Sequence, residues 1–377
     1  MSASDGRGPL QVERRAQLLD ELQRQGTVRV SDLTERLGVA AVTIRRDIAQ
    51  MAAEGLVRRV HGGVTLILPD ETGGEESAYA TTHAVGAGPR TLGMLVPSLD
   101  YYWPGVVRGA EEAAREYGHK VVLRGSSYES EDDRPQLERL VDGLGADGLL
   151  IAPRLDAPTV DATLEWLAAT GVPTVLVERT ATVGPHHAVL ESVTTDHALG
   201  AAMGVRHLHS LGHRRVGAVL SKGSPTSQHI LRGWHDAVTG AGFATKDTVD
   251  VLLPGLRSAE WDAALDETLD RCLSTGTTAL LVHADAEAMA VVQRCEERHL
   301  TVPGDLSVVA YDDEVAGLFS PPLTAVRPPR RSIGRAAVDL VVARFADPGR
   351  PTHRVVISPS LRVRESTAAP RGAAASS

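Results

Sequence analysis

Near the start of the chain, apolar side chains recur three or four positions apart, the spacing of helices with one buried face. This pattern predicts helices over residues 13–25 and 32–37, and a third helix that ends at Gly55. Glycine suits that end because it adopts the left-handed closing conformation without a Cβ penalty. With a short strand expected at Thr27–Val30, the segment reads helix, strand, helix, turn, helix.

The third helix carries Arg45 and Arg46 between its apolar positions, and a short basic ribbon, Leu56–Val60, follows it. The ribbon leads into a His-Gly-Gly sequence at residues 61–63, which permits a tight turn. A basic helix followed by a basic hairpin is typical of a winged helix-turn-helix, with one part for the major groove and the other for the neighbouring backbone or minor groove. We therefore expect a DNA-reading unit over residues 11–68, after a disordered start at residues 1–10.

The pattern changes twice after this unit. Residues 69–90 are rich in Gly, Glu, Thr, Ser and Ala and show no apolar period, as expected of a linker. From Thr91 onward, short apolar runs typical of buried strands alternate with helical segments. This alternation predicts an α/β fold of parallel sheets with crossover helices, with enough strands for two doubly wound lobes and a ligand cleft between them. The expected helices are Gly105–Tyr117, Asp133–Leu144, Pro158–Thr170, His197–Leu211, Gln228–Ala241, Ala259–Leu273 and Ala286–Arg298.

Composition and charge narrow the class of protein. The chain has 377 residues, of which 42% are hydrophobic, and its net charge is −9. Residues 1–68 hold ten Arg and eight Asp or Glu, net +2, so the remaining residues carry net −11. The positive end is the one with the helix-turn-helix pattern, which favours DNA contact through that end alone. Two cysteines, no secretory signal and no apolar run of 18 residues indicate a cytoplasmic protein without membrane contact.

Two motifs in the DNA-reading unit carry a family resemblance. They are TIRRDI at Thr43–Ile48 and GLVRRVHGG at Gly55–Gly63. In sequence and separation they resemble the DNA-binding domain of the DeoR family. The resemblance implies operator contacts, although Arg46 or Asp47 forming an ion pair inside the unit is an open alternative. The expected DNA-binding residues are Thr43, Arg45, Arg46, Arg58 and His61.

Four motifs in the larger region carry a second resemblance. They are LGHRRV at Leu211–Val216, VPGDLSVVAYDD at Val302–Asp313, PPLTAV at Pro321–Val326 and LRVREST at Leu361–Thr367. Together they resemble the effector domain of the lactose-repressor (LacI) family, which shares its fold with periplasmic sugar-binding proteins. The resemblance covers residues 91–367 and leaves residues 368–377 as an expected disordered tail.

The second resemblance implies a sugar site in the cleft. Aromatic rings stack on the apolar face of a sugar, and charged or amide groups bind its hydroxyls. Packing of the aromatics in the core, and helix capping by Asp312 or Asp313, are the alternatives. The implied effector-binding residues are Asp100, Tyr102, Trp103, Arg179, Trp261 and Asp312.

Three positions depart from the family pattern in the second lobe. Ile230 stands where the family has Arg, Ala284 where it has Asn, and Pro328 where it has Gln or Asp. Each change removes a group that binds hydroxyls, unless other side chains take over. We therefore expect weak binding of free pentoses and hexoses, and tighter binding of a larger or more apolar ligand that stacks on aromatic rings. The candidate replacements are Gln228, His229 and His283.

These patterns predict an effector-responsive transcriptional regulator of a carbohydrate-utilisation operon, acting as a homodimer on operator DNA. Repression rather than activation is implied by the two resemblances alone. No catalytic residues, cofactor or metal site are expected: His207 and His209 point about 200° apart on a helix, and His213 belongs to the LGHRRV motif. The alternative is a solute-binding protein of a sugar transporter, and a sugar-converting enzyme is the weaker third interpretation.

Overall fold

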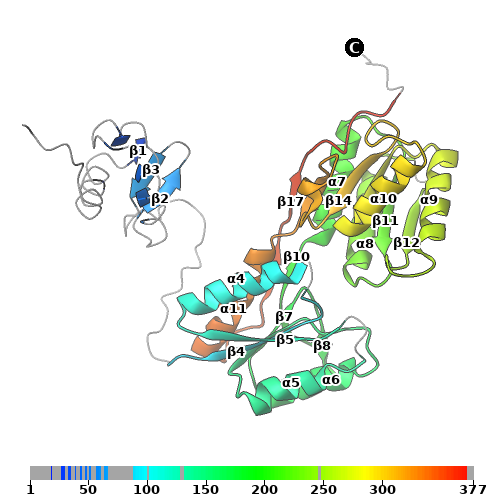
Figure 1. The fold of residues 1–377 in the computed structure, drawn as a ribbon. Helices are drawn as coiled ribbons and strands as arrows, with labels where there is room; N and C mark the ends of the chain where they lie inside the picture. The colour runs from blue at the N-terminus through cyan, green and yellow to red at the C-terminus, as the bar shows by residue number, and fades with distance from the viewer. Residues whose placement is uncertain are drawn as a thin grey trace, which may run out of the picture. The chain divides into compact units, whose positions relative to one another are not determined.

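The computed structural model divides the chain into two units, Met1–Thr82 and His83–Ser377 (Figure 1). The boundary falls inside the predicted linker, whose residues 69–87 lie outside the described residues, as do residues 1–10. The structure describes residues 18, 27–29, 33–34, 39, 43–44, 47–48, 51, 57–60, 63–66, 88–99, 102–127, 131–244 and 248–371.

The first unit contains a three-stranded antiparallel sheet. Its strands are β1 (Thr27–Arg29), β2 (Val57–Val60) and β3 (Gly63–Leu66), in the order β1-β3-β2. Strands β2 and β3 form a hairpin in which Val60 pairs with Gly63. The predicted strand and the predicted basic hairpin are therefore confirmed, and β3 joins them into one sheet.

Five apolar residues of this unit are helical and buried. They lie in the three segments where helices are predicted, so the helical spacing of the sequence is confirmed at these positions. Asp47 is also buried, with only 3% of its surface exposed, and it has an interaction partner. The five core residues are Leu18, Leu33, Ile44, Ile48 and Met51.

The first lobe of the larger unit is a six-stranded, fully parallel sheet between two helical layers. The strand order is β16-β10-β7-β6-β4-β5. Alternate residues of β4 point to opposite faces: Met94 packs with α4 and α11, and Leu95 packs with α5 and α6. The strands are β4 (Thr91–Val96), β5 (Lys120–Gly125), β6 (Gly148–Ile151), β7 (Thr174–Val177), β10 (Glu191–Thr195) and β16 (Arg354–Ile357). The other elements are α4 (Tyr102–Glu116), α5 (Arg134–Glu138), η1 (Arg139–Gly143), α6 (Val160–Thr170), β8 (Thr182–Val183), β9 (Ala188–Val189) and α11 (Arg330–Ala346).

The second lobe repeats this design with strand order β12-β11-β13-β14-β15-β17, and only β17 runs antiparallel. Helices α7 and α8 cover one face, and α9 and α10 cover the other. The strands are β11 (Val216–Ser221), β12 (Asp250–Leu253), β13 (Ala279–His283), β14 (Ser307–Tyr311), β15 (Thr324–Arg327) and β17 (Ser360–Arg362). The helices are α7 (His197–Ser210), α8 (Thr226–Gly240), α9 (Trp261–Thr275), α10 (Asp285–Glu297) and η2 (Ala316–Leu318). Two doubly wound lobes are therefore confirmed.

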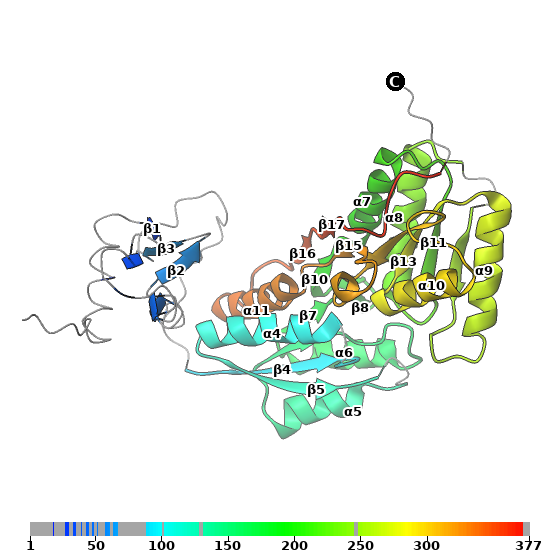
Figure 2. The same cartoon turned by 45° about the horizontal axis from the view of Figure 1, so that its top comes forward.

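The chain crosses between the lobes three times, after β10, after β15 and after β16 (Figure 2). Neither lobe is a continuous stretch of sequence, because α11 and β16 return to complete the first lobe. These two elements, with β10, β12, β15 and β17, were not among the predicted elements.

Close helix contacts in both lobes depend on glycine. A methyl group at Gly109 of α4 would overlap the backbone carbonyl of Arg331, and one at Gly334 of α11 would overlap the carbonyl of Val106. In the second lobe, a methyl at Gly233 of α8 would overlap the backbone of Ala198. The glycine of the Gly233-Trp234 sequence therefore serves helix packing.

The sequence predicts that a disordered C-terminal tail begins at residue 368, and this start is too early. Residues 368–371 pack on the second lobe: Nε2 of His213 lies 2.9 Å from the carbonyl oxygen of Ala368, and Arg371 pairs with Asp305. His213 also lies 2.8 Å from the hydroxyl of Thr278 through Nδ1, so its role in the LGHRRV motif is structural.

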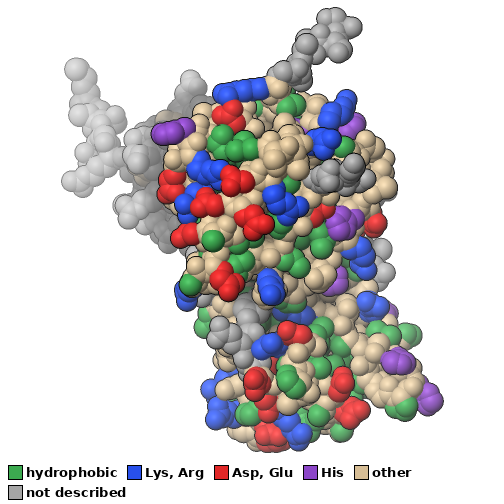
Figure 3. Space-filling view, turned by 90° about the vertical axis from the view of Figure 1, so that its right-hand side faces the viewer, with side chains coloured by type: hydrophobic (Ala, Val, Ile, Leu, Met, Phe, Trp, Pro, Cys, Tyr) green, Lys and Arg blue, Asp and Glu red, His purple; other side chains and the backbone are tan. Residues whose placement is uncertain are grey.

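The outer face over α9 and α10 carries acidic and basic side chains in alternation (Figure 3). Arg294 and Arg298 of α10 pair with Asp262, Asp266 and Asp270 of α9. Such a face is solvated rather than apolar. Within the residues that the structure describes, no helix is both long and apolar enough to cross a membrane.

Candidate functional site

The residues expected to read DNA are placed only in part. Thr43 is helical and half-buried, and Arg58 lies on β2 of the hairpin. Arg45, Arg46 and His61 lie outside the described residues. Their contacts with DNA therefore stay a prediction.

The cleft between the lobes holds a cavity of about 380 Å³. Its walls come from residues at or just beyond the carboxyl ends of strands in both sheets, where α/β folds bind ligands. The first lobe contributes Ser98, Tyr102, Trp103, Glu178 and Arg179, and His197 lies at the first crossing. The second lobe contributes Ser221, Gly223, Ser224, Thr226, His283, Ala284, Glu287 and Asp312.

Glu178 is the centre of a buried hydrogen-bond network at the floor of the cavity. It accepts hydrogen bonds from the Tyr102 hydroxyl, from the Thr195 backbone N–H at 3.0 Å and from the Thr195 hydroxyl at 2.6 Å. Nε2 of His197 lies 3.3 Å from its second oxygen, and Nδ1 of the same ring lies 3.0 Å from the Tyr311 hydroxyl. His197 thereby connects a first-lobe carboxylate to a second-lobe phenol.

The pKa values of Glu178 and Tyr102 determine the charge of this network. Burial alone would raise the pKa of Glu178, but the hydrogen bond and charge of His197, with hydrogen bonds from Thr195 and Tyr102, lower that pKa to about 2. Burial and the Glu178 charge raise the pKa of Tyr102 well above its usual value. Glu178 is therefore ionised, and Tyr102 remains a hydrogen-bond donor, throughout the neutral range.

Arg179 is held against the first lobe. Its Nε donates to the carbonyl of Pro153 at 3.2 Å and its Nη1 to the carbonyl of Glu178 at 2.7 Å. The guanidinium carbon lies 6.0 Å from the centroid of the Trp103 ring. Arg179 is only 6% exposed, so it offers the cavity little more than one edge of its guanidinium group.

The aromatic residues contribute less ring surface than the sequence predicts. Trp103 lines the cavity but is 2% exposed, and it packs edge-on against Tyr102 with ring centroids 5.5 Å apart. Trp261 does not line the cavity: it begins α9 and is buried in the second-lobe core. Its assignment to the effector site is corrected, because its ring packs among the core residues of the second lobe. Asp100 lies outside the described residues.

On the second lobe, Asp312 follows β14 directly and reaches the cavity. Nε2 of His283 lies 3.9 Å from its Oδ2, and no hydrogen bond to its carboxylate occurs among the described residues. Burial and the nearby Asp285 charge raise the pKa of Asp312 to about 8, against the opposing charge of Arg330. Burial and the His197 charge lower the pKa of His283 to about 3, so this imidazole is neutral.

The loop after β14 is held by Asp285, not by Asp312 or Asp313 acting as a cap. Asp285 accepts hydrogen bonds from four consecutive backbone N–H groups, residues 313–316, at 2.7–3.1 Å. Asp313 is buried and pairs with Arg327 and Arg364. The capping alternative is therefore replaced by a structural role for Asp285 and Asp313, which leaves Asp312 to the cavity.

One of the three candidate replacements lines the cavity. His283 does so, whereas Gln228 and His229 do not. Ile230 is fully buried among second-lobe apolar residues, so it packs in the core and brings no polar group to the cavity. Several cavity residues were not among the predicted site residues, although each lies near a strand end or a helix start. They are Ser98, Glu178, His197, Ser221, Gly223, Ser224, Thr226 and Glu287.

A more open hollow of about 540 Å³ lies at the opposite edge of the first-lobe sheet. Its lining includes Arg90 and Asp147, which directly precede β4 and β6, and Glu191, the first residue of β10. Glu191 pairs there with Arg344 at 3.0 Å and with Arg350 at 2.5 Å. The Glu191 carboxylate of this hollow is therefore already paired with arginines of the protein. The interlobe cavity is the better candidate for a ligand site. No group of three His, Cys, Asp or Glu residues suited to a metal occurs within the described part of the chain.

Comparison with known proteins agrees with this architecture. Residues 14–69 match the DeoR-like helix-turn-helix domain, and residues 205–367 match the periplasmic binding protein-like domain. An uncharacterised HTH-type transcriptional regulator from the aml 5′ region of Streptomyces limosus is 31% identical over 288 residues, covering 74% of this chain and 78% of the relative. The ribose operon repressor of Escherichia coli is 27% identical over 283 residues, covering 73% of this chain and 82% of that protein.

Among solved structures, the lac repressor dimer bound to operator and an anti-inducer is 26% identical, with a TM-score of 0.60. The match covers 75% of this chain and 96% of the repressor chain. Three findings agree that the chain is a transcriptional regulator of this architecture. They are the helix-turn-helix match, the two-lobed fold and the relative above 30% identity. The chain belongs to the LacI family of transcriptional regulators.

Proposed function

We propose that this protein represses a carbohydrate-utilisation operon, and that a small effector in the interlobe cavity changes its affinity for operator DNA. The observation that carries this function is the presence of two parts in one chain: a helix-turn-helix match at residues 14–69 and a cavity at the carboxyl ends of two parallel sheets. The combination favours a regulator over a solute-binding protein of a transporter, which has no use for a DNA-reading unit.

The DNA-reading unit acts as a DeoR-type winged helix-turn-helix in this proposal. The helix that contains Thr43 enters the major groove, with Arg45 and Arg46 contacting bases or phosphates. Arg58, on strand β2 of the hairpin, contacts the neighbouring DNA backbone in this proposal, together with His61. Buried Asp47 serves the packing of the unit.

The effector cavity acts through the two lobes that form it. A ligand seated between Glu178 and Arg179 on one side and Asp312 on the other would favour one spacing of the lobes over another. The ribose operon repressor among the relatives supports a carbohydrate-like ligand. Trp103 and Tyr102 would contact it by their ring edges.

Operator binding by a homodimer completes the proposal. A single winged helix makes few contacts, and useful affinity comes from two half-sites spaced by whole helical turns. The lac repressor is solved as a dimer on its operator, which supports the same arrangement here. Such a regulator acts in the cytoplasm, where its operator lies.

The experiment is a mobility-shift titration of the DNA upstream of the protein's own gene. Arg45→Ala combined with Arg46→Ala should abolish retention, since a base-contacting Arg contributes about 1–3 kcal/mol. The melting of the larger unit should stay unchanged. Retention equal to that of the unmodified protein would remove this helix from the proposed recognition role.

A further inference from the structure

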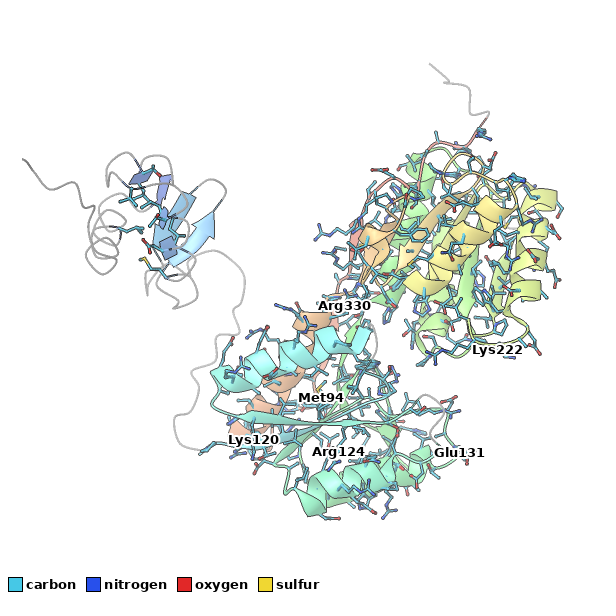
Figure 4. The ribbon with its side chains drawn as sticks, in the orientation of Figure 1. Met94, Lys120, Arg124, Glu131, Lys222 and Arg330 are labelled. Carbon is cyan, nitrogen blue, oxygen red and sulfur yellow. The ribbon has the colours of Figure 1, made fainter. Side chains whose placement is uncertain are left out.

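The second-lobe wall of the cavity is made of hydrogen-bond acceptors and hydroxyls. Its acidic residues are Asp312 and Glu287. Among the cavity residues that the structure describes, none from the second lobe is Lys or Arg. Lys222 is exposed at the edge of that lobe, on the side facing the first lobe (Figure 4). Because Lys222 is not one of the cavity residues, no cationic side chain of the second lobe lies beside the two acids among the cavity residues that the structure describes.

Both acids keep acceptor capacity for a ligand. The carboxylate of Asp312 accepts no hydrogen bond among the described residues. Glu287 uses one oxygen, Oε2, for the backbone N–H of Ala284 at 3.0 Å. The side chain of His283 is 7% exposed, and its Nδ1 has no hydrogen-bond partner. A buried polar atom without a partner is rare, which marks this wall as unfinished without a ligand.

The first-lobe cation does not satisfy these acids. Nε and Nη1 of Arg179 donate to backbone carbonyls of their own lobe. Arg330, at the start of α11 (Figure 4), donates to the backbone carbonyl of Asp312 and pairs with Glu314 at 2.8 Å. Its charge lowers the pKa of Asp312 only in part. The neutral His283 ring adds no positive charge.

We propose that the cleft selects an effector that carries a protonated amine on a small polyhydroxylated frame, such as an amino sugar, with the ammonium group seated against Asp312 and Glu287. This inference rests on the proposed function and names its ligand class. An ammonium group brings three donors and one positive charge to a wall that offers acceptors, and its charge favours the ionised form of Asp312. The hydroxyls of Ser98, Ser221 and Thr226 line the same cavity and suit the hydroxyls of the frame.

Cavity size agrees with a small ligand. A volume of about 380 Å³ lies near the lower end of the range of about 300–1,000 Å³ for ligand pockets. The larger, stacking ligand expected from the sequence needs open aromatic faces. Trp103 and Trp261 are instead 2% and 5% exposed. The amine therefore replaces ring stacking as the source of selectivity.

The test is calorimetric titration of the full-length protein with matched pairs of sugars. The probes are D-glucosamine, D-galactosamine and D-mannosamine, each against its neutral parent hexose. At least one amine should bind about tenfold more tightly than its parent, because a hydrogen bond between two charged groups is roughly twice as strong as a neutral one. Tenfold corresponds to about 1.4 kcal/mol.

Two variants test whether Asp312 and Glu287 cause the preference for the amine over its parent hexose. Asp312→Asn keeps the shape but removes the charge, so the amine should lose its advantage over the parent hexose. Glu287→Gln should reduce the advantage in the same direction, which covers the case in which the first variant folds poorly. The matched control is Asp262→Asn, which removes an exposed carboxylate of the same lobe, 77% exposed, outside the cavity. It should leave the preference intact.

Three results would overturn the inference: a neutral parent hexose that binds as tightly as its amine, an amine preference that survives Asp312→Asn and Glu287→Gln together, or no binding of any of the three amines at millimolar concentration. Operator retention in the mobility-shift assay is measured independently of these titrations. The inference can therefore fail while the proposed function stands. Loss of operator retention in the unmodified protein would instead be a failure of the proposed function.

Discussion

The two lobes share a fold but present opposite chemistry to the cavity between them. Both are six-stranded, doubly wound sheets with ligand-facing residues at strand ends. Glu178 of the first lobe is saturated by donors from Tyr102, Thr195 and His197. The carboxylate of Asp312 in the second lobe accepts no hydrogen bond among the described residues. The repeated fold fixes where side chains emerge, whereas the side chains alone determine which wall is complete without a ligand.

The unsatisfied wall is nevertheless rigid in its backbone. Asp285 collects the N–H groups of residues 313–316, and Asp313 is fixed by two arginines. Asp312 itself has φ of 102°, a left-handed conformation that few residues other than glycine adopt. Such strain persists where the surroundings impose it, and it is concentrated at functional sites. The second wall is thus held in position while its carboxylate is left for a ligand.

The largest expected effect is a difference in stability between alanine variants of the two acids, Glu178 and Asp312. Glu178→Ala should destabilise the larger unit by about 3–5 kcal/mol, because it leaves His197 and the Tyr102 hydroxyl buried without their acceptor. Asp312→Ala should lose far less, since no hydrogen bond breaks. Urea unfolding followed by circular dichroism measures both. Equal losses would contradict the difference between a complete and an incomplete wall.

A smaller effect compares helix packing in the two lobes. Gly334→Ala should destabilise the first lobe by about 1–3 kcal/mol, because the new methyl group would overlap the backbone of α4. The matched control is Gly204→Ala on α7, where the nearest atom is a Leu281 side-chain carbon at 3.2 Å. That change should be neutral, or stabilising by up to about 1 kcal/mol through helix propensity. Thermal melting of both variants checks the contrast.

The smallest effect is a pH slope. The pKa of Asp312 is raised from 3.8 to about 8, so the folded state holds a proton that the unfolded state releases between these values. Stability from this group is therefore full below about pH 4 and falls as pH rises towards 8. Between pH 6 and pH 7 the loss is at most about 1.4 kcal/mol.

Asp312→Asn should flatten that slope in urea unfolding curves collected at the two pH values. Groups that face Asp312 include Asp285, Glu287 and Glu314, opposed by Arg330. His283, with a pKa of about 3, does not titrate in this window. An unchanged slope in the variant would show that another group carries it.

Much of the fold was predictable because its signals are local. Alternation of apolar runs with helical segments predicted the paired lobes, since a buried parallel strand is nearly continuous in apolar residues. The missed strands β12 and β16 lie at sheet edges and are only partly buried: β16 alternates between exposed and half-buried residues, and β12 buries only Leu253. Helix α11 was not among the predicted helices, although its buried residues recur at helical spacing, as at Ile333, Ala337 and Val341.

The site was predictable only where position along a strand decides it. Arg179 lies two residues after the end of β7, Asp312 directly follows β14, and both line the cavity. Trp261 was assigned through the family resemblance, and only packing determines that its ring faces the core. The bond between His197 and Glu178 joins residues 19 positions apart, and no local pattern reveals it.

The discontinuous first lobe bears on the order in which the protein is made. Its sheet lacks the edge strand β16, and its α4 face lacks α11, until synthesis has passed residue 357. From the end of β10 at residue 195, that is 357 − 195 = 162 residues, or about 10–30 s at typical bacterial translation rates. During this interval β10 has an open edge and α4 an uncovered apolar face. A nascent chain therefore carries its DNA-reading segment well before its effector cavity is complete.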